Sequence, residues 1–374
     1  MKVLHIINEL KKGGAGRLCL DIVRYSNALE GVEAKLITFN KTNDFSVEYP
    51  DINPVVIDAF VKLSVTKLNK TYIQELQGFL DEFQPEIIHT HLFEAEIVSR
   101  SIYYPNAKWF SHCHDNMVQF RNLGVKTLFS KQALTNFYEK RFLFQRYVIN
   151  GGNHFIAISR DAQAYFSKTA KPYSVKLLHN AIDNKKFSNP DLKQLPGNVL
   201  RLINIGSFVE KKNQIFLLDV GVALKKLSIP FELHLVGDGD KRTVLESRAK
   251  TLRIEKQVVF HGSVDHVEKL LWQSDIYVHS ATYEPLGLVL LEAMAAGLPV
   301  ITLDGKGNRD LIVQGKNGFM LMEKDAEKFA DKIVELWENK SLYREMVAFA
   351  QEFAKGYDIK EYIRRLILLY QAST

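Results

Sequence analysis

Two glutamates that share one apolar stretch are the residues of this chain whose spacing first indicates chemistry. Glu284 lies in a turn, and Glu292 lies within the apolar run that follows Pro285 and stops at Gly297. The run predicts a helix over residues 288–296, and Pro285 suits its first position because a missing N–H costs nothing there. So apolar a helix is predicted to be buried, where an unpaired carboxylate is unfavourable. Glu292 therefore needs hydrogen-bond donors, which the two hydroxyls of a ribose would supply.

The start of this helix is predicted to bind an anion. The N–H groups of Leu286, Gly287 and Leu288 would be free donors at the positive end of a helix dipole, which suits a diphosphate. Gly287 has no side chain to obstruct a close approach. Glu284 would then lie beyond the phosphates, where the hydroxyls of an attached sugar lie. An alternative stays open, in which Glu284 only favours the helix dipole and Glu292 pairs with a core cation.

Lys212 follows shortly after a predicted strand that ends before Gly206, and it is a candidate to bind a leaving group. A departing nucleoside diphosphate gains negative charge in the transition state, so a fixed cation stabilises that state more than the ground state. The alternative is that Lys211 and Lys212 are a solvated pair at the start of a surface helix.

Histidines mark the end of another predicted strand. Alternate residues of a strand share a face, so His112 and His114 are expected on one side and Cys113 on the other. We find no second Cys/His motif in the sequence to complete a tetrahedral metal site. His114 is therefore predicted to be a hydrogen-bonding group of the active site, with an ordinary polar strand end as the alternative. His89 and His91 repeat the pattern on the preceding strand, and we expect them to be structural.

Two further patterns are typical of cofactor sites, one for a divalent metal and one for a dinucleotide. Asp238 and Asp240 form a D-x-D pattern that could bind a divalent metal, but Asp240 is placed to cap the helix that follows, so we expect no metal. Gly14 and Gly16 suggest a dinucleotide fingerprint, but its third position is Cys19, and a lone G-x-G is weak evidence. We therefore expect neither a metal nor a dinucleotide cofactor.

The elements that must position these residues alternate between strands and helices. Strands are predicted over residues 3–7, 34–39, 86–91, 108–112, 154–158 and 175–179, and, after a loop over 183–198, over 200–205, 231–236, 257–260, 275–279 and 300–303. Helices are predicted over residues 17–29, 73–83, 213–227, 241–252 and 288–296. This alternation indicates an α/β fold with parallel sheets covered by helices. Ligands of such sheets bind at the carboxyl ends of the strands.

Two such series predict two facing doubly wound domains. The chain has 374 residues, which is long for a single core. We expect an N-terminal acceptor domain over residues 1–180 and a C-terminal donor domain over residues 181–358. The closing helix, within residues 359–374, is expected to cross back to the first domain.

Positive charge is concentrated in the N-terminal half. The net charge is +6, and the whole excess of Lys and Arg over Asp and Glu lies before residue 196. Residues 117–150 interleave cations with aromatic side chains, a mixture that suits an anionic membrane surface. The alternative is a solvated helix whose aromatic side chains belong to the core. No nucleic-acid module accompanies the charge, so a nucleic-acid partner is not expected.

Other sequence features bear on the compartment. No apolar stretch reaches the length of a membrane-spanning helix, and the N-terminus does not resemble a secretory signal. Cys19 and Cys113 have apolar neighbours and suit a reducing compartment. We expect the cytoplasm, including the inner face of the membrane.

The motifs together resemble one family. The Glu284–Glu292 segment resembles the E-x7-E signature of the retaining family-4 glycosyltransferases of the GT-B fold. Four further stretches resemble motifs of that family in the expected order: 12–16 (its Gly-Gly loop), 175–183, 206–213 and 236–239. The resemblance covers essentially the full chain, and the ordered set is similar to bacterial enzymes that build capsular or exopolysaccharide repeat units.

The resemblance implies a reaction and its residues. A hexose-type sugar would pass from a nucleotide diphosphate donor, expected to be UDP-linked, to a glycan or lipid-linked glycan with retention of configuration and without a metal. Glu284, Lys212 and His114 would be catalytic, with Glu284 on the donor sugar's hydroxyls and Lys212 on the diphosphate. The implied donor-binding residues are Gly13, Gly14, Gly206, Ser207, Lys212, Gly237, Gly239, Glu284, Pro285, Leu286, Gly287, Leu288 and Glu292.

The sequence departs from the family pattern at two positions. Ser207 stands where an arginine is usual, and Asp310 stands where a glutamate is common. Lys211 and Arg309 are the candidates to replace the missing arginine. Three alternatives stay open: a nucleotide-sugar epimerase of similar fold, a catalytically silent carbohydrate-binding subunit, and an NAD-dependent oxidoreductase.

Overall fold

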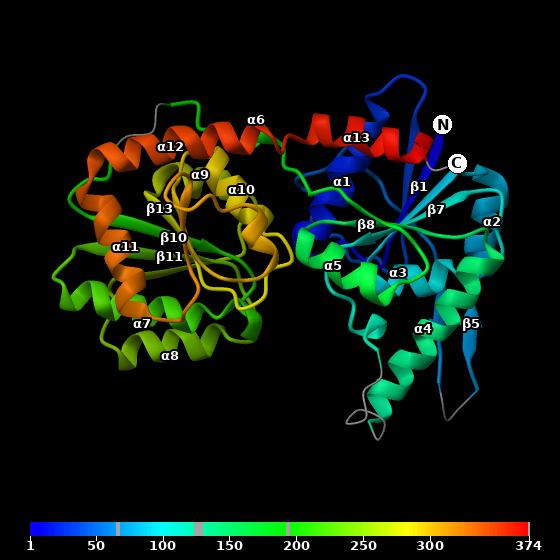
Figure 1. Ribbon diagram of the computed structural model, residues 1–374, viewed down its shortest axis with the longest axis horizontal. Helices are drawn as coiled ribbons and strands as arrows, with labels where there is room; N and C mark the ends of the chain where they lie inside the picture. The colour runs from blue at the N-terminus through cyan, green and yellow to red at the C-terminus, as the bar shows by residue number, and fades with distance from the viewer. Residues whose placement is uncertain (65–67, 123–129, 192–194, 373–374) are drawn as a thin grey trace. The chain divides into compact units, whose positions relative to one another are not determined.

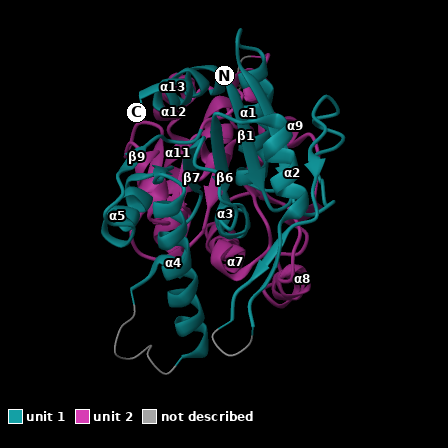
Figure 2. Ribbon diagram, turned by 90° about the vertical axis from the view of Figure 1, so that its right-hand side faces the viewer, with its two compact units in different colours: residues 1–180, 359–374 teal, residues 181–358 magenta. Residues whose placement is uncertain are grey.

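The chain forms two compact units. A computed structural model describes residues 1–64, 68–122, 130–191 and 195–372 (Figure 1). Unit 1 comprises residues 1–180 and the chain end from residue 359, and unit 2 comprises residues 181–358 (Figure 2). The polypeptide therefore passes between the units twice, after Asn180 and after Asp358.

Unit 1 is built on a seven-stranded sheet in the order β3-β2-β1-β6-β7-β8-β9, in which every pairing is parallel. Its strands are β1 (Lys2–Ile7), β2 (Glu33–Thr38), β3 (Val55–Val56), β6 (Ile87–His91), β7 (Lys108–Cys113), β8 (His154–Ala157) and β9 (Val175–Leu177). A separate antiparallel hairpin joins β4 (Phe60–Lys62) to β5 (Lys70–Tyr72). The central strands are buried along almost their whole length, as expected for a sheet covered on both faces.

Helices cover both faces of this sheet. They are α1 (Gly14–Asn27), α2 (Gln74–Phe83), α3 (Leu92–Ser99), α4 (Lys131–Ile149), α5 (Arg160–Thr169) and α13 (Ile359–Ala372), with a 3-10 turn, η1 (Val118–Phe120). One face carries Leu4, Ile6 and Ile88 and packs against α2, α3, α5 and the second half of α4. The opposite face carries histidines and packs against α1 and α13, which also contact each other (Figure 1).

Unit 2 is built on a second parallel sheet of six strands, in the order β12-β11-β10-β13-β14-β15. Its strands are β10 (Leu200–Ile205), β11 (Phe231–Val236), β12 (Val258–Gly262), β13 (Ile276–His279), β14 (Val300–Leu303) and β15 (Gly318–Leu321). Its helices are α6 (Asn184–Phe187), α7 (Gln214–Lys226), α8 (Arg242–Thr251), α9 (Val267–Gln273), α10 (Leu288–Ala295), α11 (Ala326–Glu338) and α12 (Lys340–Lys355), with 3-10 turns η3 (Glu210–Lys212) and η4 (Gly307–Asp310). Its core joins α7, α8, α11 and α12 to the sheet.

The structure confirms the predicted fold class of two parallel α/β sheets, and it adds very short strands and the helices α3, α5, α9, α11 and α12, for which no range was predicted. The strands β3, β4, β5 and β15 have two to four residues, too few to show a periodic pattern. The loop predicted over residues 183–198 contains α6, because the Asp183 side chain accepts a hydrogen bond from the N–H of Lys186 and begins a short helix.

Candidate active site

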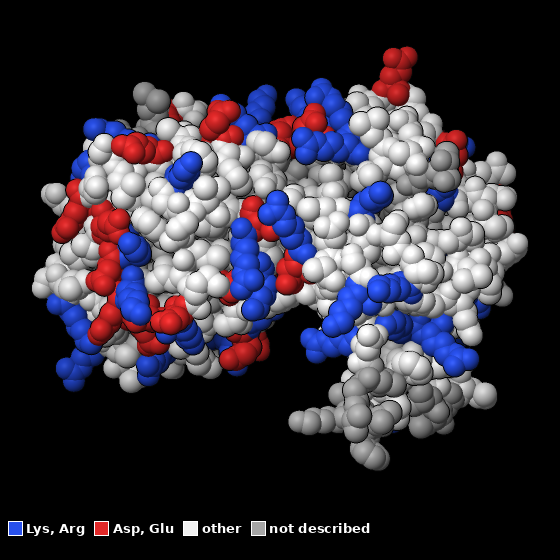
Figure 3. Space-filling model, viewed as in Figure 1, with Lys and Arg blue, Asp and Glu red and all other residues white. Residues whose placement is uncertain are grey.

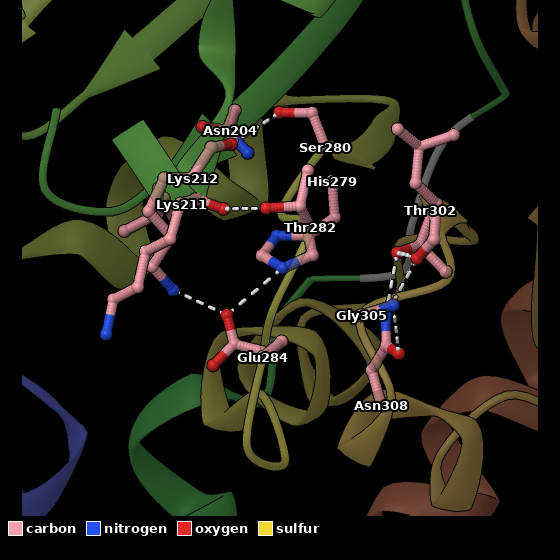
Figure 4. Close-up of polar contacts among 12 residues, drawn as sticks. Asn204, Lys211, Lys212, His279, Ser280, Thr282, Glu284, Thr302, Gly305 and Asn308 are labelled. Atoms are coloured by element: carbon pink, nitrogen blue, oxygen red, sulfur yellow. Dashed lines mark hydrogen bonds and ion pairs between the residues drawn. The ribbon is translucent and has the colours of Figure 1, made fainter. Parts of the chain in front are cut away.

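The candidate site of unit 2 lies where loops from neighbouring strands meet. Parallel strands place their carboxyl ends at one edge, so the segments after β10, β13 and β14 come together there. Thr282, after β13, donates its N–H to the carbonyl of Lys211 over 2.9 Å. Ser280 donates its hydroxyl to the carbonyl of Lys212 over 2.8 Å (Figure 4). These contacts hold the two lysines, in η3, against the loop that carries Glu284.

The backbone of Glu284 is fixed from the other side by the loop after β14. Its N–H donates to the carbonyl of Gly305 over 2.7 Å, and its carbonyl accepts from the N–H of Gly307 over 3.0 Å. A side chain at Gly307 is excluded, because a Cβ atom there would lie 1.8 Å from the carbonyl oxygen of Pro285. Asn308 closes the loop by accepting the Gly305 N–H over 2.8 Å (Figure 4). Glu284 is thus held by its main chain before any ligand binds.

One oxygen of the Glu284 carboxylate receives two donors. Lys212 Nζ lies 2.5 Å from Oε2, and His279 Nε2 lies 3.1 Å from the same atom (Figure 4). Glu284 and His279 are buried, and the Lys212 side chain is 18% exposed. Oε1 has no hydrogen-bond partner within the described ranges, so it can accept a hydrogen bond from a ligand.

The protonation states follow from this geometry. Burial alone would raise the pKa of Glu284, but the charge of Lys212 and the hydrogen bond from His279 outweigh it and lower the pKa to about 2. Burial lowers the pKa of His279. Near neutral pH the pair is therefore a carboxylate and a neutral imidazole that donates through Nε2. The Nδ1 atom of His279 is buried and has no hydrogen-bond partner in the described part of the chain.

His279 is a site residue that was not predicted from the sequence, although a strand was predicted to end there. The signal available was a histidine at the last position of a buried strand, just before the turn that carries Glu284. Only the folded turn shows that the chain reverses and returns the carboxylate to the ring.

The helix of the E-x7-E segment begins at the predicted residue, Leu288, but Pro285 is not its first position. α10 starts at Leu288 rather than at Pro285, because its N-cap, Gly287, has a left-handed φ of 96° that a helical turn cannot include. The N–H groups of Leu286, Gly287 and Leu288 have no acceptor in the part of the chain that the structure describes. The tip of α10 therefore offers main-chain donors to an anion.

Glu292 is buried on the second turn of α10. Burial raises the pKa of Tyr277, and the negative charges of Glu284 and Glu292 raise it further. Both carboxylates therefore lie within electrostatic range of one buried tyrosine. The hydroxyl of Tyr277 lies 3.2 Å from the carbonyl oxygen of Ile205, and its ring stacks on that of His279. The ribose role of Glu292 stays a prediction.

The predicted glycines of unit 2 lie next to one another at the ends of β10 and β11. A Cβ atom at Gly237 would lie 2.2 Å from the carbonyl oxygen of Gly206, so the two loops touch through their backbones. Gly239 approaches the backbone of Phe208 in the same way. Ser207 lies in this contact and is exposed.

The two cations proposed to replace the missing arginine differ in their surroundings. Arg309 forms a two-point ion pair with Asp304, Nε lying 2.8 Å from Oδ1. The Lys211 side chain is exposed and has no ion pair among the residues described. Lys211 is therefore the cation that a ligand could recruit without breaking an existing pair.

The D-x-D pattern is engaged by its own loop. Asp238 accepts the N–H of Gly239 over 2.8 Å and a guanidinium N–H of Arg242 over 3.0 Å. The predicted cap was wrong, because α8 begins at Arg242 with Lys241 as its N-cap, and Asp240 does not cap it.

In unit 1 the predicted Gly-Gly loop begins α1. Gly13 is the N-cap and Gly14 the first residue of that helix, and the Gly13 carbonyl accepts the N–H of Arg17 over 3.2 Å. The loop lies after β1, at the same edge of the sheet as the end of β7. His114 follows β7 directly and is 6% exposed.

Five histidines form one cluster in the structure, which was not predicted from the sequence. His5 of β1, His89 and His91 of β6, and His112 and His114 at the end of β7 share one face of the sheet. As predicted, Cys113 belongs to the opposite face. Parallel pairing aligns residues that are distant in sequence, so His5, His89 and His91 lie beside His112 and His114, which the sequence did not predict.

The rings do not converge on one point, however. Two groups, His5–Cys19–His91 and His89–His91–His112, have ligand atoms within 4.8 Å of one another. Both ring nitrogens of His91 are already hydrogen-bonded to other histidines. The rings of His89 and His112 are stacked at 6° with centroids 5.1 Å apart, so their lone pairs lie in nearly parallel planes. The observed arrangement suits stacking and hydrogen bonding better than coordination of one ion.

Comparison with known proteins identifies the family. Residues 12–186 match the family model "Glycosyltransferase Family 4", and residues 186–353 match "Glycosyl transferases group 1". The chain is a family-4 glycosyltransferase of the GT-B fold.

Individual relatives of this glycosyltransferase agree with the family. It is 25% identical to the putative glycosyltransferase EpsF of Bacillus subtilis over 100% of this chain and 97% of that protein. It is 32% identical to N-acetyl-alpha-D-glucosaminyl L-malate synthase of Bacillus anthracis, over 48% of each chain. Among solved structures, Anabaena Alr3699/HepE in complex with UDP and glucose aligns over 100% of both chains with a TM-score of 0.79 and 20% identity.

The glycosyltransferase carries a projecting basic helix in the segment predicted to meet a membrane. Only Leu143 and Tyr147 of α4 are buried, while Leu134 and Phe137 are exposed on its first half. Lys and Arg side chains gather on the face of unit 1 beside this helix (Figure 3). Of the cations and aromatics noted in residues 117–150, Lys126 and Phe129 lie outside the described residues.

Some aromatic side chains of the same segment instead belong to the core. Phe120 and Tyr147 are buried, and Phe142 and Phe144 pack against them. The core interpretation therefore holds for the second half of the segment, whereas the start of α4 is exposed and its contact with a membrane stays a prediction. None of the helices described is both long and apolar enough to cross a membrane.

Proposed function

We propose that this glycosyltransferase moves a hexose-type sugar from a UDP-linked donor to a glycan or lipid-linked glycan, with retention of configuration, in polysaccharide biosynthesis. The observation that carries the proposal is the Glu284 carboxylate held by Lys212 and His279 beside the unpaired N–H groups at the tip of α10. A related structure binds UDP and glucose, and relatives act in lipopolysaccharide core and Vi polysaccharide biosynthesis.

The diphosphate would bind at the tip of α10. The N–H groups of Leu286, Gly287 and Leu288 supply main-chain donors, and Lys212 supplies a fixed positive charge close by. As the glycosidic bond to phosphate lengthens, negative charge grows on the departing UDP, and Lys212 stabilises it. Lys211 is the second cation within this loop. It takes the place of the arginine that is usual at position 207 and contacts the diphosphate.

The sugar and the ribose would lie on either side of this anion site. Glu284 uses its unpaired Oε1 to accept a hydrogen bond from a sugar hydroxyl, while its Oε2 stays with Lys212 and His279. Glu292 accepts the hydroxyls of the ribose. In unit 1, His114 and the Gly13–Gly14 loop are proposed to contact the transferred sugar.

Retention needs no covalent intermediate in this proposal. The acceptor hydroxyl attacks the anomeric carbon on the face from which UDP leaves. The new carbon–oxygen bond forms as the bond to the phosphate oxygen breaks, and the acceptor's proton passes to that oxygen. The protein's part is to hold donor and acceptor and to stabilise the charge on the phosphate.

The test is a panel of nucleotide sugars with and without candidate acceptors. Release of UDP that depends on an acceptor, with an α-linked product from an α-linked donor by NMR, is the expected result. Conversion of the donor sugar in the absence of an acceptor would indicate an epimerase instead. Binding of sugars without turnover of any donor would indicate a silent subunit.

Binding of the ribose can be tested separately. We expect Glu292→Ala to weaken the binding of UDP by at least about 10-fold in calorimetry, because two charge-assisted hydrogen bonds are lost. Glu268→Ala, in the same unit but outside this site, serves as the control. Undiminished affinity of Glu292→Ala would refute the ribose role.

We also propose that α4 binds the anionic inner surface of a membrane, where a lipid-linked acceptor would be presented. The exposed Leu134 and Phe137 lie on the same helix as Lys131 and Arg141, so one surface offers both apolar and cationic contacts.

A further inference from the structure

Three histidines of unit 1 form a continuous hydrogen-bonded chain across one face of the sheet. His5 Nδ1 lies 3.0 Å from His91 Nε2, and His91 Nδ1 lies 2.9 Å from His114 Nε2. All three rings are buried, and they come from β1, β6 and the residue after β7. The two remaining histidines of the cluster, His89 and His112, are stacked beside this chain and bond instead to Tyr370 and Asn180.

The chain can carry its protons in only two orders. A neutral imidazole has one N–H and one lone pair, so each ring of the chain must donate through one nitrogen and accept through the other. Burial and the neighbouring histidines lower the pKa of His5 to about 3 and lower the pKa values of His91 and His114. The rings are therefore neutral near neutral pH, and fixing the tautomer of one ring fixes all three.

The inner end of the chain decides the order. His5 Nε2 is buried and has no hydrogen-bond partner among the residues that the structure describes. A buried N–H without an acceptor is less favourable than a buried nitrogen lone pair without a donor. His5 therefore carries its proton on Nδ1 and donates to His91, and His91 donates from Nδ1 to His114 Nε2.

The outer end then has a defined chemical character. Because His114 accepts through Nε2, its proton lies on Nδ1. This Nδ1 atom has no hydrogen-bond partner among the described residues of the protein. We propose that His5 and His91 are positioning residues that hold His114 as a neutral hydrogen-bond donor through Nδ1. The inference rests on the proposed function, in which His114 contacts the donor sugar.

The consequence concerns what His114 does in sugar transfer. An Nδ1–H group can donate to a hydroxyl or phosphate oxygen of the substrate, but it cannot accept a proton from the acceptor hydroxyl. His114 therefore orients the sugar and does not act as the general base, which leaves the departing phosphate to take the proton.

The direct test is the tautomer of His114. Two-bond 1H–15N correlation spectra of protein labelled with 15N-histidine distinguish the two tautomers, and a His114→Phe spectrum assigns the signals. We expect the Nδ1–H form in the wild-type protein. The Nε2–H form there would overturn the proposal.

Variants of His5 test the coupling. His5→Asp replaces the donor to His91 by a carboxylate that can only accept when ionised, so His91 would donate through Nε2, His114 should shift toward the Nε2–H form, and kcat/KM should fall by about 5- to 10-fold. His5→Asn places an amide N–H near the position of Nδ1 and should restore both. His89→Leu is the matched control, since His89 lies beside His5 in register but outside the chain, and it should leave the tautomer of His114 unchanged.

Failure of this inference and failure of the proposed function are distinguishable. An unchanged tautomer and unchanged kcat/KM in His5→Asp would refute the positioning role while sugar transfer continues. A wild-type enzyme that transfers no sugar would refute the proposed function, and the tautomer spectra would still report on the chain.

Discussion

The carboxylate of Glu284 is oriented by protein contacts at one oxygen and can accept a ligand's hydrogen bond at the other. Its Oε2 is held by Lys212 and His279, whereas Oε1 has no partner within the described ranges. Since both donors act on one atom, the orientation of the carboxylate is set before a sugar hydroxyl arrives. A preorganised acceptor of this kind needs little rearrangement when its ligand binds.

The depressed pKa of Glu284 predicts a specific dependence of stability on pH. A carboxylate whose pKa is about 2 in the folded protein stabilises the fold at every pH above its unfolded value of about 4.3. That stabilisation is lost as the pH falls from about 4.5 toward 2. We expect the difference in free energy of unfolding between wild type and Glu284→Gln to be constant from about pH 5 to 8 and to shrink below about 4.5, as measured by urea denaturation.

The control for this prediction is Glu246→Gln. Glu246 forms a surface ion pair with Arg242, and its loss should change stability by no more than about 1 kcal/mol at neutral pH. A Glu284→Gln difference that stays constant down to about pH 3 would contradict the assigned pKa.

His279 is the residue for which we predict a positioning effect. His279→Leu should lower kcat/KM for sugar transfer by about 10-fold, because Glu284 loses one of the two donors that orient it. His279→Gln keeps an N–H near the position of Nε2 and should recover most of the activity. Equal losses in the two variants would indicate a role in packing alone, and steady-state kinetics with separate kcat and KM distinguish these outcomes.

At the scale of elements, short loops do most of the positioning. η3, the turn before α10 and the loop after β14 are joined by main-chain hydrogen bonds, so the side chains at their tips share one frame. α10 itself contributes a left-handed N-cap, which directs its first N–H groups away from the helix that follows. The site therefore depends on backbone contacts that few side chains can replace.

The helix α4 carries the prediction about membranes. Replacing Lys140, Arg141 and Arg146 by glutamine should release the protein from vesicles that contain anionic lipid, because each basic residue near the surface contributes about 1 kcal/mol. Co-sedimentation with anionic and with neutral vesicles measures the effect. Lys225, Lys226 and Lys250, on the surface of unit 2, supply a triple variant of equal charge as the control. Unchanged binding of the α4 variant would end this hypothesis.

At the scale of the whole molecule, each unit contributes a complete sheet with its own core. α13 belongs to unit 1 although it follows unit 2 in sequence, and its Tyr370 hydroxyl lies 2.6 Å from His89 Nδ1. The last helix is therefore part of the packing that encloses the histidine cluster.

The whole enzyme is predicted to work without a divalent metal. Lys212 and the α10 N–H groups supply the positive charge that a metal would bring to the diphosphate. We expect full turnover of the donor in excess chelator, measured as UDP release. Activity that is lost with chelator and restored by manganese would overturn this prediction.

The amino-acid sequence by itself determined the two α/β series and the E-x7-E helix. Local periodicity and turn residues carry that information, because the pattern of Leu288–Ala295 and the glycine before it act over neighbouring positions. Very short strands such as β3 were not predicted, because two residues cannot show a periodic pattern.

Only the tertiary structure decided which distant residues meet. The pair His279–Glu284 depends on how one turn closes, and the His5–His91–His114 chain depends on the register of β1, β6 and β7. Register is set by packing across the whole sheet, so a histidine at residue 5 does not reveal in sequence that its partner is residue 91. Local chemistry could be predicted from the sequence, but the contacts that orient it are long-range and exist only in the fold.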